Sequence, residues 1–453
     1  MNKESKPDII YVVSDQHRGQ AMAHMGDVNL RTPNLDALAN EGASFERAYA
    51  NCPVCTPSRG TIFSGRHAHA GPVQGFWNNW TSAGPSTATI LRQHGYHTAY
   101  FGKWHCGIVR DQVPRAVRDV GGGGARTPER HRAGFQDWNA YECINRHNSA
   151  FVYRGRDTEP TMVNGYETDG LTDMAVEYLD EYDRDNPLFL VLSPNPPHFP
   201  FTVPEQWMRF DPEELEVRPN FPDNDPKWRE TLAIYYAMIE NLDWNIGRLR
   251  EALARRSRET ILVYTSDHGE FLGSHGHLCA KEEPHEESIR VPAVFHCPGR
   301  IPAQGKIDGL FSLVDLLSTT LGLIGIEQPQ HLQGTDFSPA LRGMSFQGPD
   351  RTLIEMVGNP RWRLELRDWR GLVTNDWKYA FYETGDEVLF DLRNDPWEKH
   401  NLAREQPEQR EKMRQMLLEE LARTREPYFD VVIQHGTAPD LDDIDVAAMA
   451  DEL

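Results

Sequence analysis

Apolar runs alternate with amphipathic segments along most of the chain. Continuous apolar runs are typical of strands buried on both faces of a parallel sheet, and they predict strands at residues 8–14, 97–101, 188–192 and 260–265. Between them, apolar residues at helical spacing predict helices at about residues 33–42, 86–94, 171–182 and 228–255, the first with Thr32 as its N-cap. This alternation predicts an α/β fold, a large doubly wound, mixed or mostly parallel sheet flanked by helices.

The pattern changes near residue 345. Short strands separated by turns are predicted at residues 351–357, 371–373, 378–382 and 388–392, followed by an amphipathic helix at about 407–423. These elements predict a smaller C-terminal α+β domain, in which an antiparallel sheet is accompanied by one helix. We therefore expect a catalytic α/β domain at residues 1–345, the small domain at 346–435 and an acidic tail at 436–453.

Charge and composition exclude several classes of protein. The 453 residues include 47 Lys and Arg against 68 Asp and Glu, a formal net charge of −21. We expect no nucleic-acid partner, because binding one needs a basic face that replaces the counterions of the phosphates. A small anionic substrate stays compatible with this charge, since a cleft can focus positive potential inside a negative shell. A hydrophobic content of 39% with 11 Trp excludes wholesale disorder.

The sequence shows no pattern typical of a membrane span or a signal peptide. The N-terminus lacks a basic region followed by an apolar one, and Asp315 with a Ser-Thr-Thr cluster interrupts the apolar stretch 310–326. We therefore expect no membrane partner and a cytoplasmic protein, although an exported protein whose signal has been removed would look the same. The sequence leaves open whether the chain forms a homo-oligomer.

Carboxylates follow two of the predicted strands directly. The pair Asp15 and Gln16 follows the first strand, and the pair Asp267 and His268 follows the strand at 260–265. Ligands of open α/β sheets bind at the carboxyl ends of the strands, so neighbouring strands would bring these four side chains together as a mostly oxygen-lined cation site. Each pair alone would also fit a helix cap or a turn.

The segment Asn51-Cys52-Pro53-Val54-Cys55-Thr56-Pro57-Ser58-Arg59 has three interpretations. Cys52 and Cys55 fit a redox pair at the start of a helix, where the helix dipole lowers the pKa of a thiol. They also fit half of a zinc site, although the chain has no second Cys-x-x-Cys. In the third interpretation, Cys55 is the precursor of a nucleophile.

Several motifs, in order along nearly the whole chain, resemble those of type I sulfatases in the alkaline phosphatase superfamily. Cys55-Thr56-Pro57-Ser58-Arg59 continues into Gly60-Thr61-Ile62-Phe63-Ser64-Gly65-Arg66, which resembles the family signature. The other similar segments are Gly95-Tyr96-His97-Thr98 with Phe101-Gly102-Lys103-Trp104-His105, Asn195-Pro196-Pro197-His198-Phe199-Pro200-Phe201, Ser266-Asp267-His268-Gly269 with Lys281, and Leu389-Phe390-Asp391-Leu392 in the small domain.

The resemblance implies a role for each matching residue. It implies that Cys55 is converted by a formylglycine-generating enzyme into formylglycine, whose hydrate attacks sulfur. The remaining implied roles are cation binding by Asp15, Gln16, Asp267, His268 and residue 55, contacts to the diol by Arg59 and Lys103, deprotonation of its second hydroxyl by His105, and contacts to the sulfate and leaving alcohol by His198 and Lys281. Such chemistry needs a cation and basic side chains, because charge shifts on the sulfate oxygens in the transition state.

Two departures from the family pattern affect the expected metal. Many sulfatases have a second Asp where this chain has Gln16, and Asn where it has His268. This exchange removes a negative charge and adds a nitrogen ligand, so we expect Ca²⁺ first, with Mn²⁺ or Mg²⁺ as alternatives. The same pairs also resemble those of phosphonate monoester hydrolases and choline sulfatases.

The sequence thus predicts a sulfuric ester hydrolase that releases inorganic sulfate and an alcohol from a small-molecule or saccharide sulfate ester. Three alternatives stay open: a phosphonate monoester or phosphodiester hydrolase, a thiol-disulfide oxidoreductase that uses Cys52 and Cys55, and a silent binder of sulfated glycans. For an acidic or polysulfated saccharide, aromatic and amide groups would contact the ring and basic groups its charges. The candidates are Trp77, Asn78, Asn79 and Trp80, with Arg110, Arg115, Arg118, Arg126, Arg130, His131 and Arg132. The other interpretation makes the two Trp core residues and the basic groups solubilising charges.

Overall fold

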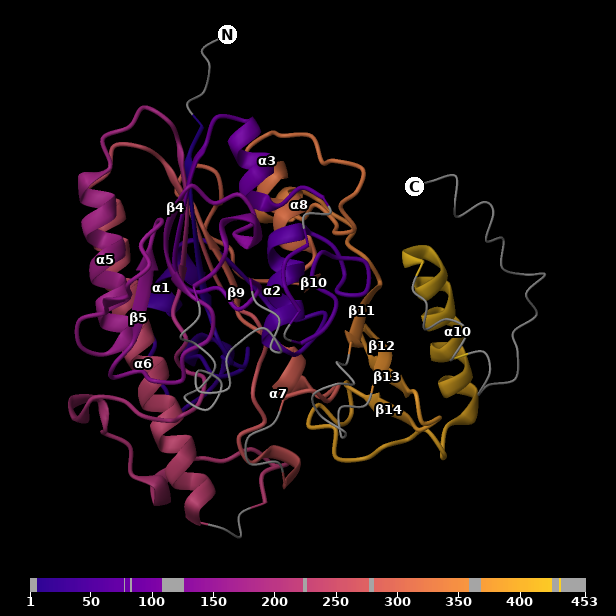
Figure 1. Cartoon of the computed structure of the whole chain (residues 1–453). Helices are drawn as coiled ribbons and strands as arrows, with labels where there is room; N and C mark the ends of the chain where they lie inside the picture. Colours follow the sequence, from indigo (N-terminus) through magenta and orange to yellow (C-terminus); the bar gives the residue numbers. More distant parts are fainter. Residues whose placement is uncertain are drawn as a thin grey trace.

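The computed structural model describes residues 6–76, 78–81, 84–107, 126–222, 226–276, 281–357, 368–425 and 432. Its main feature is a ten-stranded sheet with the strand order β10-β2-β9-β8-β1-β7-β3-β4-β5-β6 (Figure 1). The strands are β1 (Asp8–Ser14), β2 (Ala43–Tyr49), β3 (His97–Lys103), β4 (Asp137–Tyr141), β5 (Phe151–Arg154), β6 (Thr161–Met162), β7 (Leu188–Ser193), β8 (Thr260–Ser266), β9 (Ala293–His296) and β10 (Gly305–Ser312). The central pairs β8-β1, β1-β7, β7-β3 and β3-β4 are parallel, whereas β9 and β5 run antiparallel to their neighbours.

Helices cover both faces of this sheet (Figure 1). Alternate residues of β1 enter two different cores: Ile9, Tyr11 and Val13 pack into one, and Ile10 and Val12 into the other. This is why β1 is apolar throughout, without the polar alternation of a strand that has one exposed face. The helices are α1 (Pro33–Glu41), α2 (Cys55–Ser64), α3 (Thr87–Gln93), α5 (Glu167–Glu181), α6 (Pro226–Ala254), α7 (Glu286–Ile289), α8 (Asp315–Leu323) and α9 (Ser338–Leu341).

A second, four-stranded antiparallel sheet follows, as the sequence predicts. Its strands are β11 (Arg351–Met356), β12 (Trp369–Thr374), β13 (Trp377–Tyr382) and β14 (Glu387–Asp391), and α10 (Pro407–Thr424) lies beside it (Figure 1). Trp369 and Ile354 of this sheet pack with Tyr49 and Cys52 in one buried cluster, so the two sheets share a core. The predicted fold class is confirmed.

The apolar pattern misses several elements and misassigns one cap. It misses β10, whose first half carries the exposed Lys306 and Asp308. Thr32 does precede α1, but its side chain does not cap the helix, because its hydroxyl donates to Asp36 Oδ1 (2.9 Å). The carboxylate of Asp243 accepts the N–H of Leu35 (2.7 Å) instead, so a distant helix supplies the cap.

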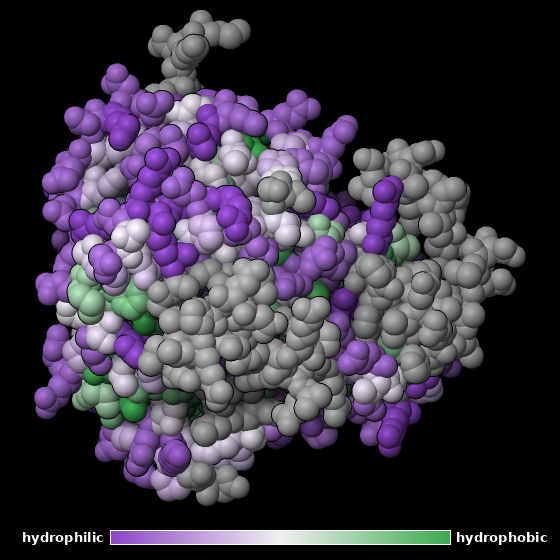
Figure 2. All heavy atoms as spheres, viewed as in Figure 1, coloured by the Kyte–Doolittle hydropathy of each residue, from purple (hydrophilic) through white to green (hydrophobic). Residues whose placement is uncertain are grey.

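In the described part of the chain, we find no helix that is both long and apolar enough to cross a membrane. The coloured atoms of the face in Figure 2 are mainly hydrophilic, with small hydrophobic areas between them. Five residues or segments of the sequence predictions lie outside the described residues: Trp77, Arg110, Arg115, Arg118 and the acidic tail.

Candidate active site

The two predicted carboxylates meet because their strands are neighbours. β1 pairs with β8 in parallel register, with Ser14 opposite Ser266, so both Asp15 and Asp267 leave the sheet at the same edge. The next residue, Gln16, has a left-handed backbone with φ of 70°. Its N–H thereby donates to Asp267 Oδ1 (3.2 Å), which ties the two strand ends together.

Helix α2 brings Cys55 to this edge. All ten residues of α2 are buried, and Gly60 is required where the helix meets Val73, because a Cβ there would lie 2.8 Å from the Val73 Cβ. Cys55 is the first residue of the helix, and its Sγ lies 3.1 Å from His268 Nε2 and 3.7 Å from Asp15 Oδ1. The interior position of α2 therefore fixes the thiol against both strand ends.

Four of the predicted metal ligands form one cluster. Ligand atoms of Asp15, Cys55, Asp267 and His268 all lie within 4.8 Å of one another, and all four residues are buried. His268 Nδ1 donates to the Gly269 carbonyl (2.8 Å), which leaves the Nε2 lone pair directed at the cluster. Burial, followed by Lys281, lowers the pKa of His268 to about 4, so it is the neutral imidazole that a metal requires. Carboxylate oxygens and a neutral imidazole fit a divalent cation.

The side chain of Gln16 lies beside this cluster with other partners. Its Oε1 accepts a hydrogen bond from Lys281 Nζ (3.0 Å), and its Nε2 donates to Glu270. The part of Gln16 in metal binding stays a prediction.

Two basic side chains contact the carboxylates directly. Arg59, one turn after Cys55 on α2, donates from Nε to Asp267 (2.9 Å) and from a terminal nitrogen to Asp15 (3.1 Å). Lys103, at the end of β3, places Nζ 2.7 Å from Asp15 Oδ2. These side chains are wholly buried, so each charge depends on the others for its stabilisation.

The buried pairs shift the acid–base behaviour of the carboxylates in opposite directions. Burial alone would raise the pKa of Asp15, but Lys103, followed by the neighbouring histidines and Arg59, holds it well below its usual range. Burial and the adjacent Asp15 raise the pKa of Asp267 above its ordinary value. Asp15 is therefore the more readily ionised carboxylic acid of the two.

A third basic group, Lys281, contacts the thiol itself. Its Nζ lies 3.4 Å from Cys55 Sγ and 3.1 Å from His198 Nε2. His198 Nδ1 faces the carbonyl of Phe199 (2.7 Å), so Nε2 is free to accept from Lys281. Burial, followed by Lys281, keeps the pKa of His198 well below its usual value. In this arrangement the proton of the pair resides on Lys281.

His105 follows Lys103 by two residues and is also buried. Its backbone is left-handed, with φ of 56°, and its ring meets that of Phe76 edge-on at 5.6 Å. Burial, followed by Lys103 and Arg59, holds the pKa of His105 well below its ordinary value, so its imidazole is neutral. The structure thus gathers Asp15, Cys55, Arg59, Lys103, His198, Asp267, His268 and Lys281 around one point, with His105 within the field of their charges.

Sequence reasoning leaves two partners of this site unassigned. Asn195 Oδ1 accepts from Lys103 Nζ (2.8 Å), and Ser193 Oγ accepts from Arg59 (2.8 Å). Ser193 is the last residue of β7 and Asn195 comes two residues later, so the rule that ligands gather at the carboxyl ends of strands could have identified both.

The structure disfavours a redox role for the two cysteines. Both thiols are free, and Cys52 packs in the apolar cluster between the sheets. Burial raises the pKa of Cys52, and burial followed by Asp15 raises that of Cys55 to about 11. A reactive thiol needs the opposite shift.

Two residues proposed to contact a saccharide have structural roles. Trp80 is buried and packs against Trp104, as the core interpretation predicts. Arg132 is buried over the ring of Trp138 and donates to the carbonyls of Thr127 and Gly155. These two side chains are therefore not available to a sugar.

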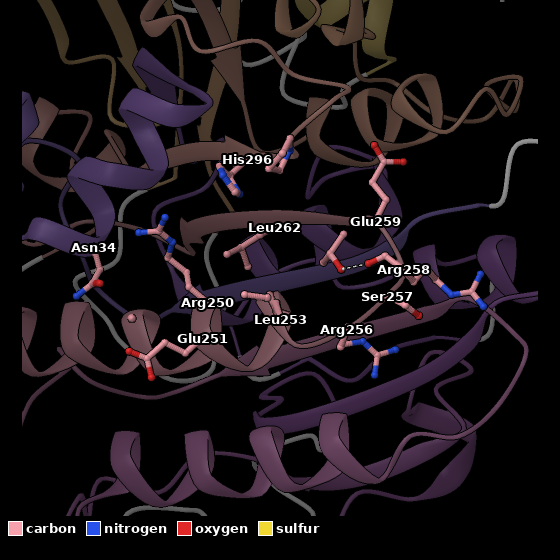
Figure 3. Close-up of a pocket in the computed structure, with 14 residues that line it drawn as sticks. Asn34, Arg250, Glu251, Leu253, Arg256, Ser257, Arg258, Glu259, Leu262 and His296 are labelled. Atoms are coloured by element: carbon pink, nitrogen blue, oxygen red, sulfur yellow. Dashed lines mark hydrogen bonds between the residues drawn. The ribbon is translucent and has the colours of Figure 1, made fainter.

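A cavity of about 700 Å³ lies at the opposite, amino end of the sheet (Figure 3). The end of α6, the start of β8 and His296 line it, and none of the predicted site residues does. Its arginines have partners: Arg256 pairs with Asp8 (2.7 Å) and Arg250 with Glu41 (2.8 Å). The cavity and the cluster around Cys55 are separate features.

Comparisons with known proteins agree with this geometry. The Sulfatase family matches residues 7–326, and the family of the N-sulphoglucosamine sulphohydrolase C-terminal region matches residues 273–427. An ulvan-active sulfatase of Formosa agariphila is 31% identical over 411 residues, which cover 88% of this chain and 78% of the relative. An endo-4-O-sulfatase of Bacteroides thetaiotaomicron is 28% identical, over 87% of this chain and 88% of the relative. The crystal structure of yidJ from Bacteroides fragilis superimposes with a TM-score of 0.86 at 27% identity, over 95% of this chain and 99% of that one.

Proposed function

This chain belongs to the sulfatase family, and we propose that it hydrolyses sulfate monoesters of saccharides through a formylglycine at position 55 and a divalent cation. The observation that supports this best is the buried cluster of Asp15, Cys55, Asp267 and His268 at the start of α2. A family-typical nucleophile position here coincides with a set of atoms that could bind a metal.

The cation would be held by Asp15, Asp267, His268 and residue 55. When bound, it would act as a Lewis acid toward a sulfate oxygen and lower the pKa of a hydroxyl at position 55. Two carboxylates are hard ligands that favour Ca²⁺, and the imidazole nitrogen makes Mn²⁺ the main alternative, with Mg²⁺ next. A hydrated aldehyde, formed from Cys55 by a formylglycine-generating enzyme, would supply that hydroxyl.

The chain's own side chains bind and orient the anion. Three basic side chains, Arg59, Lys103 and Lys281, face the two carboxylates of Asp15 and Asp267 around the thiol. The three cationic groups favour a sulfate group and would stabilise charge that develops on its oxygens.

Proton transfer falls to the two histidines and Lys281. The ammonium of Lys281 lies 3.1 Å from His198 Nε2, and we assign this pair to the oxygen of the leaving alcohol, which needs a proton as its bond to sulfur breaks. His105 is neutral and can accept a proton from the second hydroxyl at position 55. Both roles require a neutral imidazole with one unprotonated ring nitrogen before the reaction starts. The lowered pKa values of His105 and His198 are in line with this requirement.

The saccharide part of the proposal is supported by relatives. The names of the ulvan-active sulfatase and the endo-4-O-sulfatase denote enzymes of sulfated saccharides. Their similarity covers most of this chain, which supports the same class of substrate.

Paired kinetics with a sulfate and a phosphonate test the reaction. The protein is produced with a formylglycine-generating enzyme, and nitrophenyl sulfate is compared with a nitrophenyl phosphonate monoester. We expect a higher kcat/KM for the sulfate, and its loss in Cys55→Ala. A higher kcat/KM for the phosphonate would instead identify a phosphonate monoester hydrolase on the same fold.

A further inference from the structure

The loop that presents His198 has little means of holding itself in place. Three of the six residues in Asn195-Pro196-Pro197-His198-Phe199-Pro200 are proline and have no N–H to donate. Within the loop, the His198 N–H donates to the Asn195 carbonyl (3.0 Å). Further support for this loop has to come from side chains outside it.

A buried pair, Glu167 and His147, supplies that support from the start of α5 and the segment before β5. His147 Nε2 faces the carbonyl oxygen of His198 (2.8 Å), and Nδ1 faces Glu167 Oε2 (3.1 Å). Both ring nitrogens thus face oxygen atoms of other residues, so the ring is held at two points. Both side chains are wholly buried, so water cannot replace these contacts.

The same carboxylate holds the other end of the loop. Glu167 Oε1 accepts the N–H of Asn195 (2.8 Å), and the Asn195 side chain then accepts from Lys103 Nζ (2.8 Å). Asn195 Nδ2 donates to the Ile144 carbonyl (2.9 Å), which fixes the orientation of its amide. The pair therefore contacts His198 directly, through His147, and reaches Lys103 through one intermediate, Asn195.

We propose that Glu167 and His147 are positioning residues for cleavage of the sulfate ester, acting through the loop they anchor. The kinetic consequence rests on the proposed function, whereas the structural consequence rests on these contacts alone. If the pair is lost, the His198 ring leaves its place against Lys281 Nζ. Protonation of the leaving alcohol is then slowed more than the attack on sulfur is.

Leaving-group dependence separates positioning from a general structural role. Mature His147→Phe is assayed with nitrophenyl sulfate, whose leaving group needs little protonation, and with a simple alkyl sulfate, whose leaving group needs it fully. We expect kcat/KM to fall about 100-fold for the alkyl ester but only about tenfold for the nitrophenyl ester. His147→Gln keeps a donor for the His198 carbonyl and should restore most of the alkyl-ester rate.

The matched control is His97→Phe. His97 forms a carboxylate–histidine pair with Asp137 (2.8 Å) at the opposite end of β3, and its loss should leave the ratio of the two rates unchanged. Equal losses on both substrates in His147→Phe, or no loss, would overturn the proposal. A crystal structure of His147→Phe gives a second readout, in which an unmoved His198 would also overturn it. If the wild type cleaves neither ester, the proposed function fails, and the crystal structure still decides the positioning.

Discussion

Two buried aspartates stand at the two ends of β1 and invite comparison. Asp8 begins the strand and Asp15 follows its last residue, and each has a basic partner at 2.7 Å, Arg256 for Asp8 and Lys103 for Asp15. Neither side chain is exposed to solvent. By burial and pairing alone, the two ends of the strand look equivalent.

Their surroundings differ in what else converges on them. Asp8 accepts from the backbone N–H of Leu188 and pairs with Arg256 and Arg258, which line the cavity of Figure 3. Asp15 shares its surroundings with a second carboxylate, an imidazole and the thiol of Cys55. Under the proposed function, a cavity and paired charges do not locate the chemistry in this fold, whereas the convergence of potential metal ligands on residue 55 does.

The largest effect should separate these two aspartates. Asp15→Asn should reduce kcat/KM for nitrophenyl sulfate by at least about 1000-fold, because a metal contributes several kcal/mol of transition-state stabilisation. Asp8→Asn should leave kcat/KM near the wild-type value while destabilising the fold by about 1–3 kcal/mol, since Arg256 loses its partner. Kinetics, metal analysis and denaturation of both variants test this. Comparable activity losses would break the comparison.

A smaller effect is expected at Lys281, which contacts the thiol without ligating a metal in the proposal. Lys281→Ala should lower kcat about 100-fold, as removal of one preorganised donor does in other enzymes. Metal content should stay at the wild-type level. Loss of the metal together with activity would move Lys281 into the group that maintains the metal site.

A buried ion pair that lies away from both ends of β1 should affect the stability of the fold and not the activity. Glu355 of β11 pairs with His69 Nδ1 (2.8 Å). Burial would raise the pKa of Glu355, but His69, followed by Arg370, lowers it from 4.5 to about 2. Because the folded-state pKa is depressed, the stabilisation is complete above pH about 4.5 and is lost as the pH falls toward about 2.

Glu355→Gln should therefore be less stable than the wild type at pH 7 by about 3 kcal/mol, with unchanged kcat. This difference in unfolding free energy should shrink steadily between pH 4.5 and pH 3. A difference that is constant with pH would mean that the carboxylate charge does not matter.

The smallest effect is expected from a substitution in the cavity at the amino end of the large sheet. Arg250 pairs with Glu41, whose side chain is 54% exposed, and solvent screens this pair. Arg250→Ala should change the free energy of unfolding by less than about 1 kcal/mol and leave kcat/KM unaltered. A marked loss of turnover in Arg250→Ala would show that the cavity serves the reaction.

Local patterns predict the central strands and three members of the cluster, Asp15, Asp267 and His268, whereas the place of Cys55 in it comes from the family resemblance. β1 and β8 are buried on both faces, so their apolar runs are unbroken, and the carboxylates that follow them stand out. β10 is less visible, because Lys306, Asp308 and the glycines around them interrupt its apolar residues. Contacts such as His147 to the His198 carbonyl join residues 51 positions apart, and the sequence alone does not pair them.

The most direct test of the account measures the fraction of aldehyde at position 55 against turnover. Preparations made with different amounts of a formylglycine-generating enzyme are analysed by mass spectrometry of the peptide that contains residue 55, and each is assayed with a sulfate ester at saturating metal. The account predicts that kcat rises in proportion to the aldehyde fraction and vanishes when position 55 is wholly thiol. Full turnover with an intact thiol, or full conversion to the aldehyde with no turnover of any sulfate ester, would contradict it.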